Sequence, residues 1–366
     1  MDIGVPKEIK TDEFRVAITP SGVNELVKEG HKVYVEVDAG KGSGLTDEEY
    51  ERAGGILLKS AKEVFDVSDM IVKVKEPIEE EYALFKNNQT LFTYLHLAAD
   101  KQLTDFLLEK GIRAFAYETL SLDGHLPLLE PMSEVAGKMA SLMGAVYIGR
   151  YYGGRGVLAG GVVGTQRAQV MILGGGVAGK AASEVAAGLG ADVKVFDTNL
   201  KRLHYLKDVL PSNVTTMYSS HTNITDLLPH CDIVIGTVLI PGAKTPHLIS
   251  KEMLSLMKKG SVLVDVSIDQ GGCFETSHAT THSDPTFIKE DIVHYCVANM
   301  PGAYPRTSTY ALTNATLSYI KDLARHGAEK ICGESIVMKS ALNTYDGVLY
   351  NSAVGEALGI NSSSFV

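Results

Sequence analysis

The sequence has few cysteines, no long uncharged apolar run and no cluster of basic residues. Its four cysteines have no CxxC spacing, so we expect no structural zinc or other metal site, and a reducing cytoplasmic setting fits. No segment approaches the roughly 18 apolar residues of a membrane span, so we expect no membrane partner. The net charge of −10, without a basic block, argues against nucleic acid as a partner.

The composition is that of an ordinary globular protein. The first residues, MDIGVP, lack the charged and apolar regions of a signal peptide, so we expect none. The 366 residues suffice for about two domains, and cores of that size need no disulfides.

Short apolar strands alternate with helical stretches over the first 120 residues and again from residue 169. This alternation predicts an α/β protein with two Rossmann-like domains built on parallel sheets. A long helix is predicted over 131–152, and the glycine-rich segment 153–164 reads as a hinge or loop. We expect short helices over 328–360, in a tail that folds back on the first domain.

The segment MILGGGVAGKAAS contains Gly174-x-Gly176-x-x-Gly179 between a strand and a helix. The first glycine allows a tight turn, the second lets the backbone approach a pyrophosphate, and Gly179 lets the helix pack near the strand. The helix N-terminus offers free N–H donors to the phosphates. A glycine turn that binds nothing is the alternative.

A second strand ends at Asp197, close to the expected spacing of about 20 residues from the glycines. A carboxylate there accepts hydrogen bonds from the ribose hydroxyls and repels a 2′-phosphate, which favours NAD over NADP. Arg202 follows and could still meet a phosphate.

Four further residues follow three later strands of the same unit. Val238 and Leu239 come after CDIVIGT, Asp269 after GSVLVDVS and Asn299 after IVHYCVAN. Ligands bind at the carboxyl edge of such sheets. Asp269, in LVDVSIDQGGCFE, is therefore either a solvated loop acid or a group of the site.

The first domain offers three candidates for binding and proton transfer. Arg15 lies in EFRVAITP, Lys75 ends the predicted strand MIVKVK, and His96 ends TLFTYLH. A guanidinium fork suits a carboxylate, a lysine can polarise a carbonyl, and a histidine titrates near neutral pH. The alternatives are a surface ion pair of Arg15 with Glu13, a strand-end lysine and a core histidine.

These residues lie in segments that resemble bacterial alanine dehydrogenase. The matching segments run in order along nearly the whole chain: EFRVAITP, VKVKEP, TYLHLAAD, PMSEVAGKMA, GGGVAGKAA, DVSIDQGGCFE, HYCVANMPGA and TSTYALTNAT.

The resemblance implies reversible, NAD-dependent oxidation of L-alanine to pyruvate and ammonium, commonly in a homohexamer. It implies a discontinuous substrate domain (1–130 and 305–366), an NAD-binding domain (131–304) and an active site in the cleft between them. Arg15 and Lys75 would bind the substrate, and His96 and Asp269 would be the catalytic acid/base groups. The cofactor contacts would be Ser133, Gly174, Gly176, Val177, Ala178, Gly179, Asp197, Arg202, Ser219, Val238, Leu239, Val266, Asn299 and Met300.

One position departs from the family. His278, in FETSHATT, stands where many relatives carry arginine near the cofactor, and a histidine is a weaker, pH-dependent cation.

Three other functions stay open: the NAD(H)-binding component of a proton-translocating transhydrogenase, a saccharopine-type or opine-type dehydrogenase, and an inactive NAD-binding scaffold.

Overall fold

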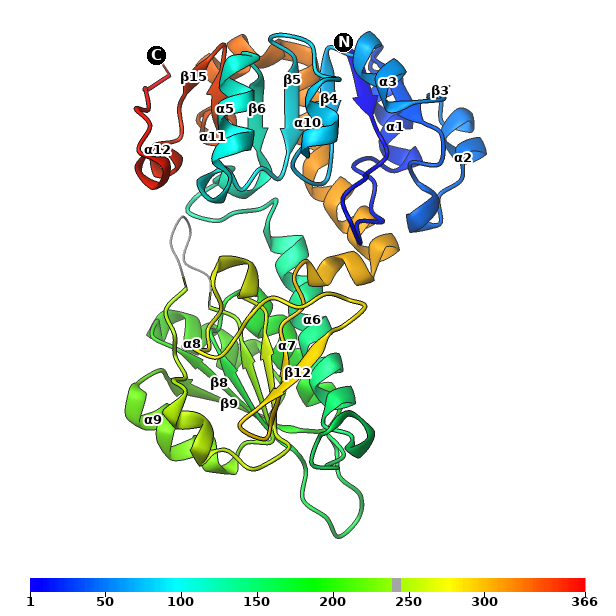
Figure 1. The fold of residues 1–366 in the computed structure, drawn as a ribbon. Coiled ribbons are helices and arrows are strands. Elements are labelled where there is room, and N and C mark those ends of the chain that lie inside the picture. Colours follow the sequence, from blue (N-terminus) through cyan, green and yellow to red (C-terminus); the bar gives the residue numbers. More distant parts are fainter. Residues whose placement is uncertain (239–244, 366) are drawn as a thin grey trace. The chain divides into compact units, whose positions relative to one another are not determined.

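The computed structural model describes residues 1–238 and 245–365 (Figure 1). The chain forms two compact units: unit 1 comprises Met1–Met132 and Tyr304–Val366, and unit 2 comprises Ser133–Ala303. Each unit is a mostly parallel sheet with helices, which confirms the predicted α/β fold class. In the described part of the chain, no helix is both long and apolar enough to cross a membrane.

Unit 1 contains an eight-stranded sheet in the order β15-β14-β6-β5-β4-β1-β2-β3, in which the strands from β3 to β6 pair in parallel and β14 and β15 are antiparallel. The strands are β1 (Asp2–Val5), β2 (Lys32–Glu36), β3 (Ile56–Leu58), β4 (Met70–Val72), β5 (Thr90–Thr93), β6 (Arg113–Ala116), β14 (Leu342–Tyr345) and β15 (Val348–Leu349).

The helices of unit 1 are α1 (Pro20–Lys28), α2 (Asp47–Arg52), α3 (Ala61–Val67), α4 (Glu79–Tyr82), α5 (Lys101–Glu109), α10 (Pro305–Glu334), α11 (Ile336–Ala341) and α12 (Ser352–Leu358). Local sequence sets where they begin: Thr19 caps α1 by accepting the N–H of Gly22, and Asp100 caps α5. The helix axis of α10 breaks at Gly327, whose φ of 74° is not helical.

The tail beyond α10 corrects the sequence prediction. We expected only short helices over 328–360, but β14 lies there and pairs antiparallel with β6. The tail does return to the sheet of unit 1, as an added strand at its edge. The antiparallel turn at Asp346 and Gly347, both with positive φ, makes this short hairpin possible.

Unit 2 contains a seven-stranded sheet in the order β12-β13-β11-β10-β7-β8-β9 (Figure 1). The strands are β7 (Gln169–Leu173), β8 (Asp192–Asp197), β9 (Val214–Tyr218), β10 (Ile233–Gly236), β11 (Val262–Asp265), β12 (Thr286–Lys289) and β13 (Ile292–Tyr295). All pairs are parallel except β12 with β13. Read from β7, the parallel strands follow the order 3-2-1-4-5-6, and the order reverses between β7 and β10, where such sheets bind ligands.

The helices of unit 2 are α6 (Glu130–Tyr147), α7 (Val177–Gly188), α8 (Leu200–Val209) and α9 (His221–Leu227). Strand β7 shows why both faces of the sheet are covered. Val170 and Ile172 belong to one buried apolar cluster and Met171 and Leu173 to another, because successive side chains point to opposite faces.

Candidate functional site

The glycine loop connects β7 to α7 at the point where the strand order reverses. Gly174 has φ of 102°, a conformation that favours glycine. A Cβ on Gly179 would lie 1.8 Å from the carbonyl oxygen of Gly174, so only glycine fits where α7 meets the loop. A Cβ on Gly176 would meet nothing within 4 Å, which leaves open space beside the first N–H groups of α7. These features fit a bound phosphate group.

Asp197 and Arg202 both contact this loop. The carboxylate of Asp197, at the end of β8, accepts the N–H of Gly175 and the N–H of Asn199, each at 2.8 Å. The guanidinium of Arg202 donates to the carbonyl oxygens of Gly175 at 2.5 Å and Gly176 at 3.1 Å. Arg202 therefore supports the loop itself, a role that the sequence reading did not foresee.

The other predicted cofactor residues of unit 2 lie along the same carboxyl edge. Ser219 donates its N–H to the carbonyl oxygen of Asp197, and Val266 donates to that of Gly236. The carbonyl oxygen of Val238 accepts the hydroxyl of Ser267 at 2.7 Å, and Met300 is buried. Leu239 lies outside the described residues.

Ser133 lies in helix α6, one turn before the point where this helix contacts α7. A Cβ on Gly137 would lie 2.1 Å from the carbonyl oxygen of Ala178, so α6 packs directly on the start of α7. Ser133 is four residues before Gly137 and shares its helix face. Ser133 and Ala178 are thereby brought to the same region.

Asp269 lies beyond β11 in a short 3₁₀ turn (Ile268–Gln270). Its carboxylate is exposed and accepts the N–H of Asn299 at 3.4 Å. Gly271 and Gly272 follow with φ of 96° and 81°, so the turn behind Asp269 requires glycine. Asp269 and Asn299, predicted from separate strands, are neighbours in unit 2.

The loop that carries Asp269 is anchored by the buried Asp265. Its carboxylate accepts the backbone N–H groups of Ser267 at 3.1 Å and Cys273 at 2.9 Å and the hydroxyl of Ser277 at 2.6 Å. Burial raises the pKa of Asp265, against the effect of these hydrogen bonds. Next to Asp269, the buried Oε1 of Gln270 has no hydrogen-bond partner among the described residues, and nothing in the sequence singled Gln270 out.

Arg15, in unit 1, is not on the surface. Its side chain is 2% exposed, and Nε and Nη2 donate to the two oxygens of Glu13 at 2.6 and 2.5 Å. Burial opposes the charged guanidinium, but Glu13 outweighs it and raises the pKa of Arg15. The alternative of a surface ion pair is wrong, because the pair is buried and fork-shaped.

Lys75 and His96 lie beyond the ends of their strands, which corrects the prediction that both end a strand. Strand β4 ends at Val72 and β5 at Thr93, and the Thr93 hydroxyl donates to the carbonyl oxygen of Lys75 at 2.9 Å. Burial alone would raise the pKa of Glu76, but Lys75, Lys10 and His96 together lower it. Lys75 and His96 are therefore close to one carboxylate at one edge of the sheet.

His96 is exposed and adopts the left-handed conformation, with φ of 52° and ψ of 36°. Its ring lies parallel to that of the buried Tyr94, with centroids 6.0 Å apart and an interplanar angle of 4°. Burial raises the pKa of the same tyrosine overall, although the charge of Arg15 lowers it, so Arg15 lies near this aromatic group. His96 is not a core histidine.

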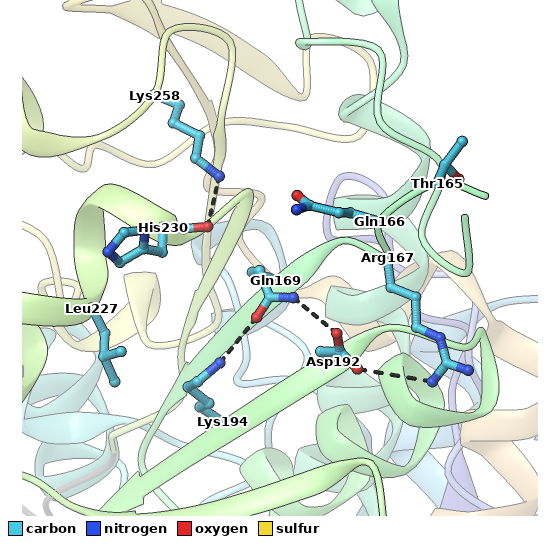
Figure 2. Close-up of a pocket in the computed structure, with 9 residues that line it drawn as sticks. All are labelled: Thr165, Gln166, Arg167, Gln169, Asp192, Lys194, Leu227, His230 and Lys258. Atoms are coloured by element: carbon cyan, nitrogen blue, oxygen red, sulfur yellow. Dashed lines mark hydrogen bonds and ion pairs between the residues drawn. The ribbon is translucent and has the colours of Figure 1, made fainter. Parts of the chain in front are cut away.

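A polar hollow of about 690 Å³ lies elsewhere in unit 2 (Figure 2). Gln169 and Asp192, which line it, begin β7 and β8, so it is at the opposite edge of the sheet from the glycine loop. Its charged groups contact their neighbours: Lys194 donates to Gln169, and Lys258 donates to the carbonyl of His230. None of the predicted site residues lines this hollow.

The strand order and the glycine loop define unit 2 as a nucleotide-binding α/β unit of the Rossmann type. The chain belongs to the alanine dehydrogenase/PNT family: the N-terminal domain model of that family matches residues 4–136 and the C-terminal domain model matches residues 140–352. The second match runs past unit 2 into the residues that complete unit 1.

Individual relatives agree with this assignment. The chain is 53% identical over 98% of its length to an alanine dehydrogenase of Methanococcus maripaludis, covering 96% of that protein. It is 51% identical, over 98% of the chain and 95% of the relative, to an alanine dehydrogenase of Bacillus subtilis. A solved L-alanine dehydrogenase matches with a TM-score of 0.94 and 46% identity, over 98% of this chain and 99% of that one.

A solved transhydrogenase from Sinorhizobium meliloti shares the fold, with a TM-score of 0.82 over 96% of this chain and 100% of that one. Its sequence identity to this chain is 24%. The family model names alanine dehydrogenase and PNT together, so it is the alanine dehydrogenases at about 50% identity that favour the alanine dehydrogenase reading over the transhydrogenase reading. His278, the position that departs from relatives, is exposed, and its ring stacks on Phe287 at 3.7 Å between centroids.

Proposed function

We propose that this protein catalyses the reversible oxidative deamination of L-alanine to pyruvate and ammonium with NAD as the hydride carrier. One observation carries the proposal: a chain about half identical to alanine dehydrogenases over nearly its full length has Lys75 and His96 near the carboxylate of Glu76, and Arg15 near Tyr94, on which the ring of His96 stacks. A carboxylate-binding cation and a proton-transfer group are what an amino-acid substrate requires.

The glycine loop and Asp197 would hold the cofactor. Open space at Gly176 suits the pyrophosphate, and the Asp197 carboxylate beside the loop suits ribose hydroxyls rather than a 2′-phosphate. NAD⁺ bound there would supply a hydride acceptor. This residue set supports NAD as the partner, with Ser133, Ser219, Val238 and Asn299 as further contacts.

Arg15 and Lys75 would bind the substrate. Glu13 orients the Arg15 guanidinium through Nε and Nη2, and the guanidinium would pair with the alanine carboxylate and so fix which way the Cα–H points. The ammonium of Lys75 would stabilise the negative charge that grows on the carbinolamine oxygen as this intermediate loses its hydroxyl proton and collapses to pyruvate.

His96 and Asp269 would move the protons. Hydride loss converts alanine to iminopyruvate, water attacks the imine carbon, and the resulting carbinolamine releases ammonia and pyruvate. His96 would accept the proton of the attacking water, since a histidine can change its charge near neutral pH. The carboxylate of Asp269 would hold the departing ammonium or relay its proton.

The proposal is tested by following NADH absorbance at 340 nm with L-alanine and NAD⁺ at alkaline pH. We expect turnover by the wild type and a loss of about 100-fold or more in His96→Ala and Asp269→Asn. The control variants His326→Ala and Asp284→Asn change exposed residues that are not among the predicted site residues and should retain full activity. A folded wild type that binds NADH but does not oxidise alanine would refute the proposal.

We further propose a homohexamer in the cytoplasm. Unit 2 exposes the apolar side chains of Tyr151 and Val163 completely, and Ile288 is 61% exposed, surfaces that another copy of the chain could bury. The four cysteines are free thiols, which agrees with a reducing compartment. Light scattering at low salt should give a mass of six chains for the wild type and a smaller species for Val163→Asp. Cell fractionation should place the enzyme in the soluble cytoplasmic fraction.

A further inference from the structure

Glu118 and His96 are brought together by two neighbouring parallel strands. In the sheet of unit 1, β5 pairs with β6, and Thr93 is opposite Ala116 at their carboxyl ends. The two chains then leave the sheet at the same edge. His96 lies three residues beyond β5, and Glu118 lies two residues beyond β6 in a 3₁₀ turn (Tyr117–Thr119).

The carboxylate of Glu118 binds the backbone that carries His96. It accepts the N–H of His96 at 2.6 Å, and both of its oxygens lie 3.2 Å from the N–H nitrogen of Leu95. One charged acceptor thus satisfies two consecutive backbone donors. Hydrogen bonds to an ionised acceptor are about twice as strong as those between neutral groups.

The backbone at His96 needs such support. Its φ of 52° and ψ of 36° are left-handed, a conformation that costs a residue other than glycine about 1–2 kcal/mol. The chain has also left the β-sheet, so the N–H groups of Leu95 and His96 have no partner in a ladder. The carboxylate of Glu118 replaces that ladder and favours the turn.

The ring of His96 has a separate support. It stacks on Tyr94, whose own position is set by burial and by a 2.6 Å hydrogen bond from its hydroxyl to the carbonyl oxygen of Leu128. The imidazole remains exposed while both its backbone and one ring face are held. This arrangement fixes a group that must still reach a substrate.

We propose that Glu118 is a positioning residue for the acid/base group His96, an inference that rests on the proposed function. Glu118 acts through the left-handed turn and does not itself touch the substrate. Without its carboxylate, the turn relaxes and the imidazole leaves the geometry that proton transfer requires, which lowers kcat. Binding of the cofactor, which unit 2 carries out, stays unchanged.

A double-mutant cycle tests this role. We expect Glu118→Gln and Glu118→Asp each to lower kcat for alanine oxidation about tenfold, with the Kd for NADH unchanged within about twofold. In a His96→Ala background the same changes should have no further effect on kcat, because Glu118 acts only through His96. Equal losses in the two backgrounds would overturn the proposal.

Hydrogen exchange gives a readout that does not depend on activity. When the folded protein is exchanged and then digested for mass spectrometry, the peptide spanning 94–99 should exchange faster in Glu118→Gln than in the wild type, while peptides from β4 stay unchanged. Unchanged exchange over 94–99 would refute the proposed hydrogen-bonding role. A wild type without alanine turnover would instead refute the proposed function, and the exchange result would still report on Glu118.

Asp47 offers a matched control in the same unit. Its carboxylate also accepts a backbone N–H, that of Asp38 at 3.0 and 3.3 Å, and Asp38 also has positive φ, at 64°. Asp47→Asn should affect thermal stability about as much as Glu118→Gln and leave kcat unchanged. An equal fall of kcat in Asp47→Asn would show that general loss of stability explains the effect, which would contradict the proposal.

Discussion

The carboxylate of Asp197 accepts the backbone N–H of Gly175 at 2.8 Å. Asp197, which we propose to recognise the ribose of the cofactor, therefore also holds the glycine loop, which we propose to bind the phosphates. The selectivity between NAD and NADP and the geometry of the glycine loop both depend on this carboxylate, so a substitution of Asp197 should affect both. This coupling makes the choice of replacement important in any test of selectivity.

Asp197→Asn should shift the preference from NAD⁺ toward NADP⁺. The amide oxygen can still accept the N–H of Gly175, while the negative charge that repels a 2′-phosphate is gone. Since juxtaposed like charges cost several kcal/mol, we expect the ratio of kcat/KM for the two cofactors to change at least about tenfold. Asp192, at the other end of β8, provides the control: Asp192→Asn should leave the ratio unaltered.

Arg15→Lys should weaken alanine binding. Lysine keeps the positive charge beside Glu13 but lacks the planar fork that Arg15 now presents. We expect KM for alanine to rise about tenfold or more, with the Kd for NADH unchanged. Arg325 forms a similar fork with Glu29 on the surface, so Arg325→Lys is the matched control and should leave KM as it is. An unchanged KM in Arg15→Lys would remove Arg15 from the substrate site.

Lys73 should be critical for the stability of unit 1. Its side chain is 1% exposed and contacts the carboxylates of Glu8 at 3.1 Å and Glu81 at 2.7 Å. Burial disfavours its charge, but the two carboxylates outweigh burial and raise the pKa of Lys73. Lys73→Met would bury two unpaired acids, and we expect the free energy of unfolding to fall by about 3–5 kcal/mol in urea titrations.

Two further variants separate charge from packing at Lys73. Adding Glu8→Gln and Glu81→Gln to Lys73→Met removes the unpaired charges and should restore much of the stability, because the amide oxygen of residue 8 can still accept the N–H of Val74. The exposed pair Lys101–Asp105 is the control, and Lys101→Met should cost less than about 1 kcal/mol. A loss in Lys73→Met no larger than in Lys101→Met would contradict the expectation.

The sequence predicted the parts of the fold that rest on long apolar patterns. In unit 2 it located β8, β10, β11 and β13 and placed the glycine loop correctly between β7 and α7, since buried strands and a required turn leave strong local signals. It missed β3, β12, β14 and β15, which have four residues or fewer and stand at or near a sheet edge. Such short strands are held by pairing with a neighbouring strand, β12 with β13, β15 with β14 and β14 with β6, and their few residues give no strong local pattern.

The site could be predicted only in part, for a related reason. Arg15, Lys75, His96 and Asp269 could be proposed from the sequence because charged residues near predicted strand ends and a family resemblance pointed to them, and their roles stay predictions. Glu118 was not predicted, because its proposed positioning role depends on hydrogen bonds to the segment around His96, which only the folded sheet brings near. The burial of Arg15 was missed too, since sequence spacing shows a charge pair but not its exposure.

His294 should make unit 2 less stable in mild acid. The side chain is fully buried, its Nε2 lies 2.8 Å from the hydroxyl of Thr276, and its Nδ1 lies 3.0 Å from the carbonyl oxygen of Ile292. Burial, together with the nearby cations Lys289 and His278, lowers the pKa of His294 to about 4 although the Ile292 carbonyl opposes this. The neutral ring is therefore the form that the folded state requires.

The sign of the pH effect follows from proton uptake. An unfolded histidine has a pKa near 6.5, so between about pH 6.5 and 4 the unfolded chain binds a proton that the folded chain does not. The stability due to His294 is complete above that range and declines as the pH falls, by about 2 kcal/mol at pH 5. Urea titrations at pH 8 and pH 5 should show this loss in the wild type.

His294→Gln should remove this loss, because glutamine can still accept from Thr276 but takes up no proton. Comparing the two proteins at each pH cancels the contributions of the other titrating groups, including the buried Glu8 and Asp265, whose raised pKa values act in the opposite direction. The exposed His326→Gln should behave like the wild type. If His294→Gln loses as much stability as the wild type between pH 8 and pH 5, the acid sensitivity arises elsewhere in the chain.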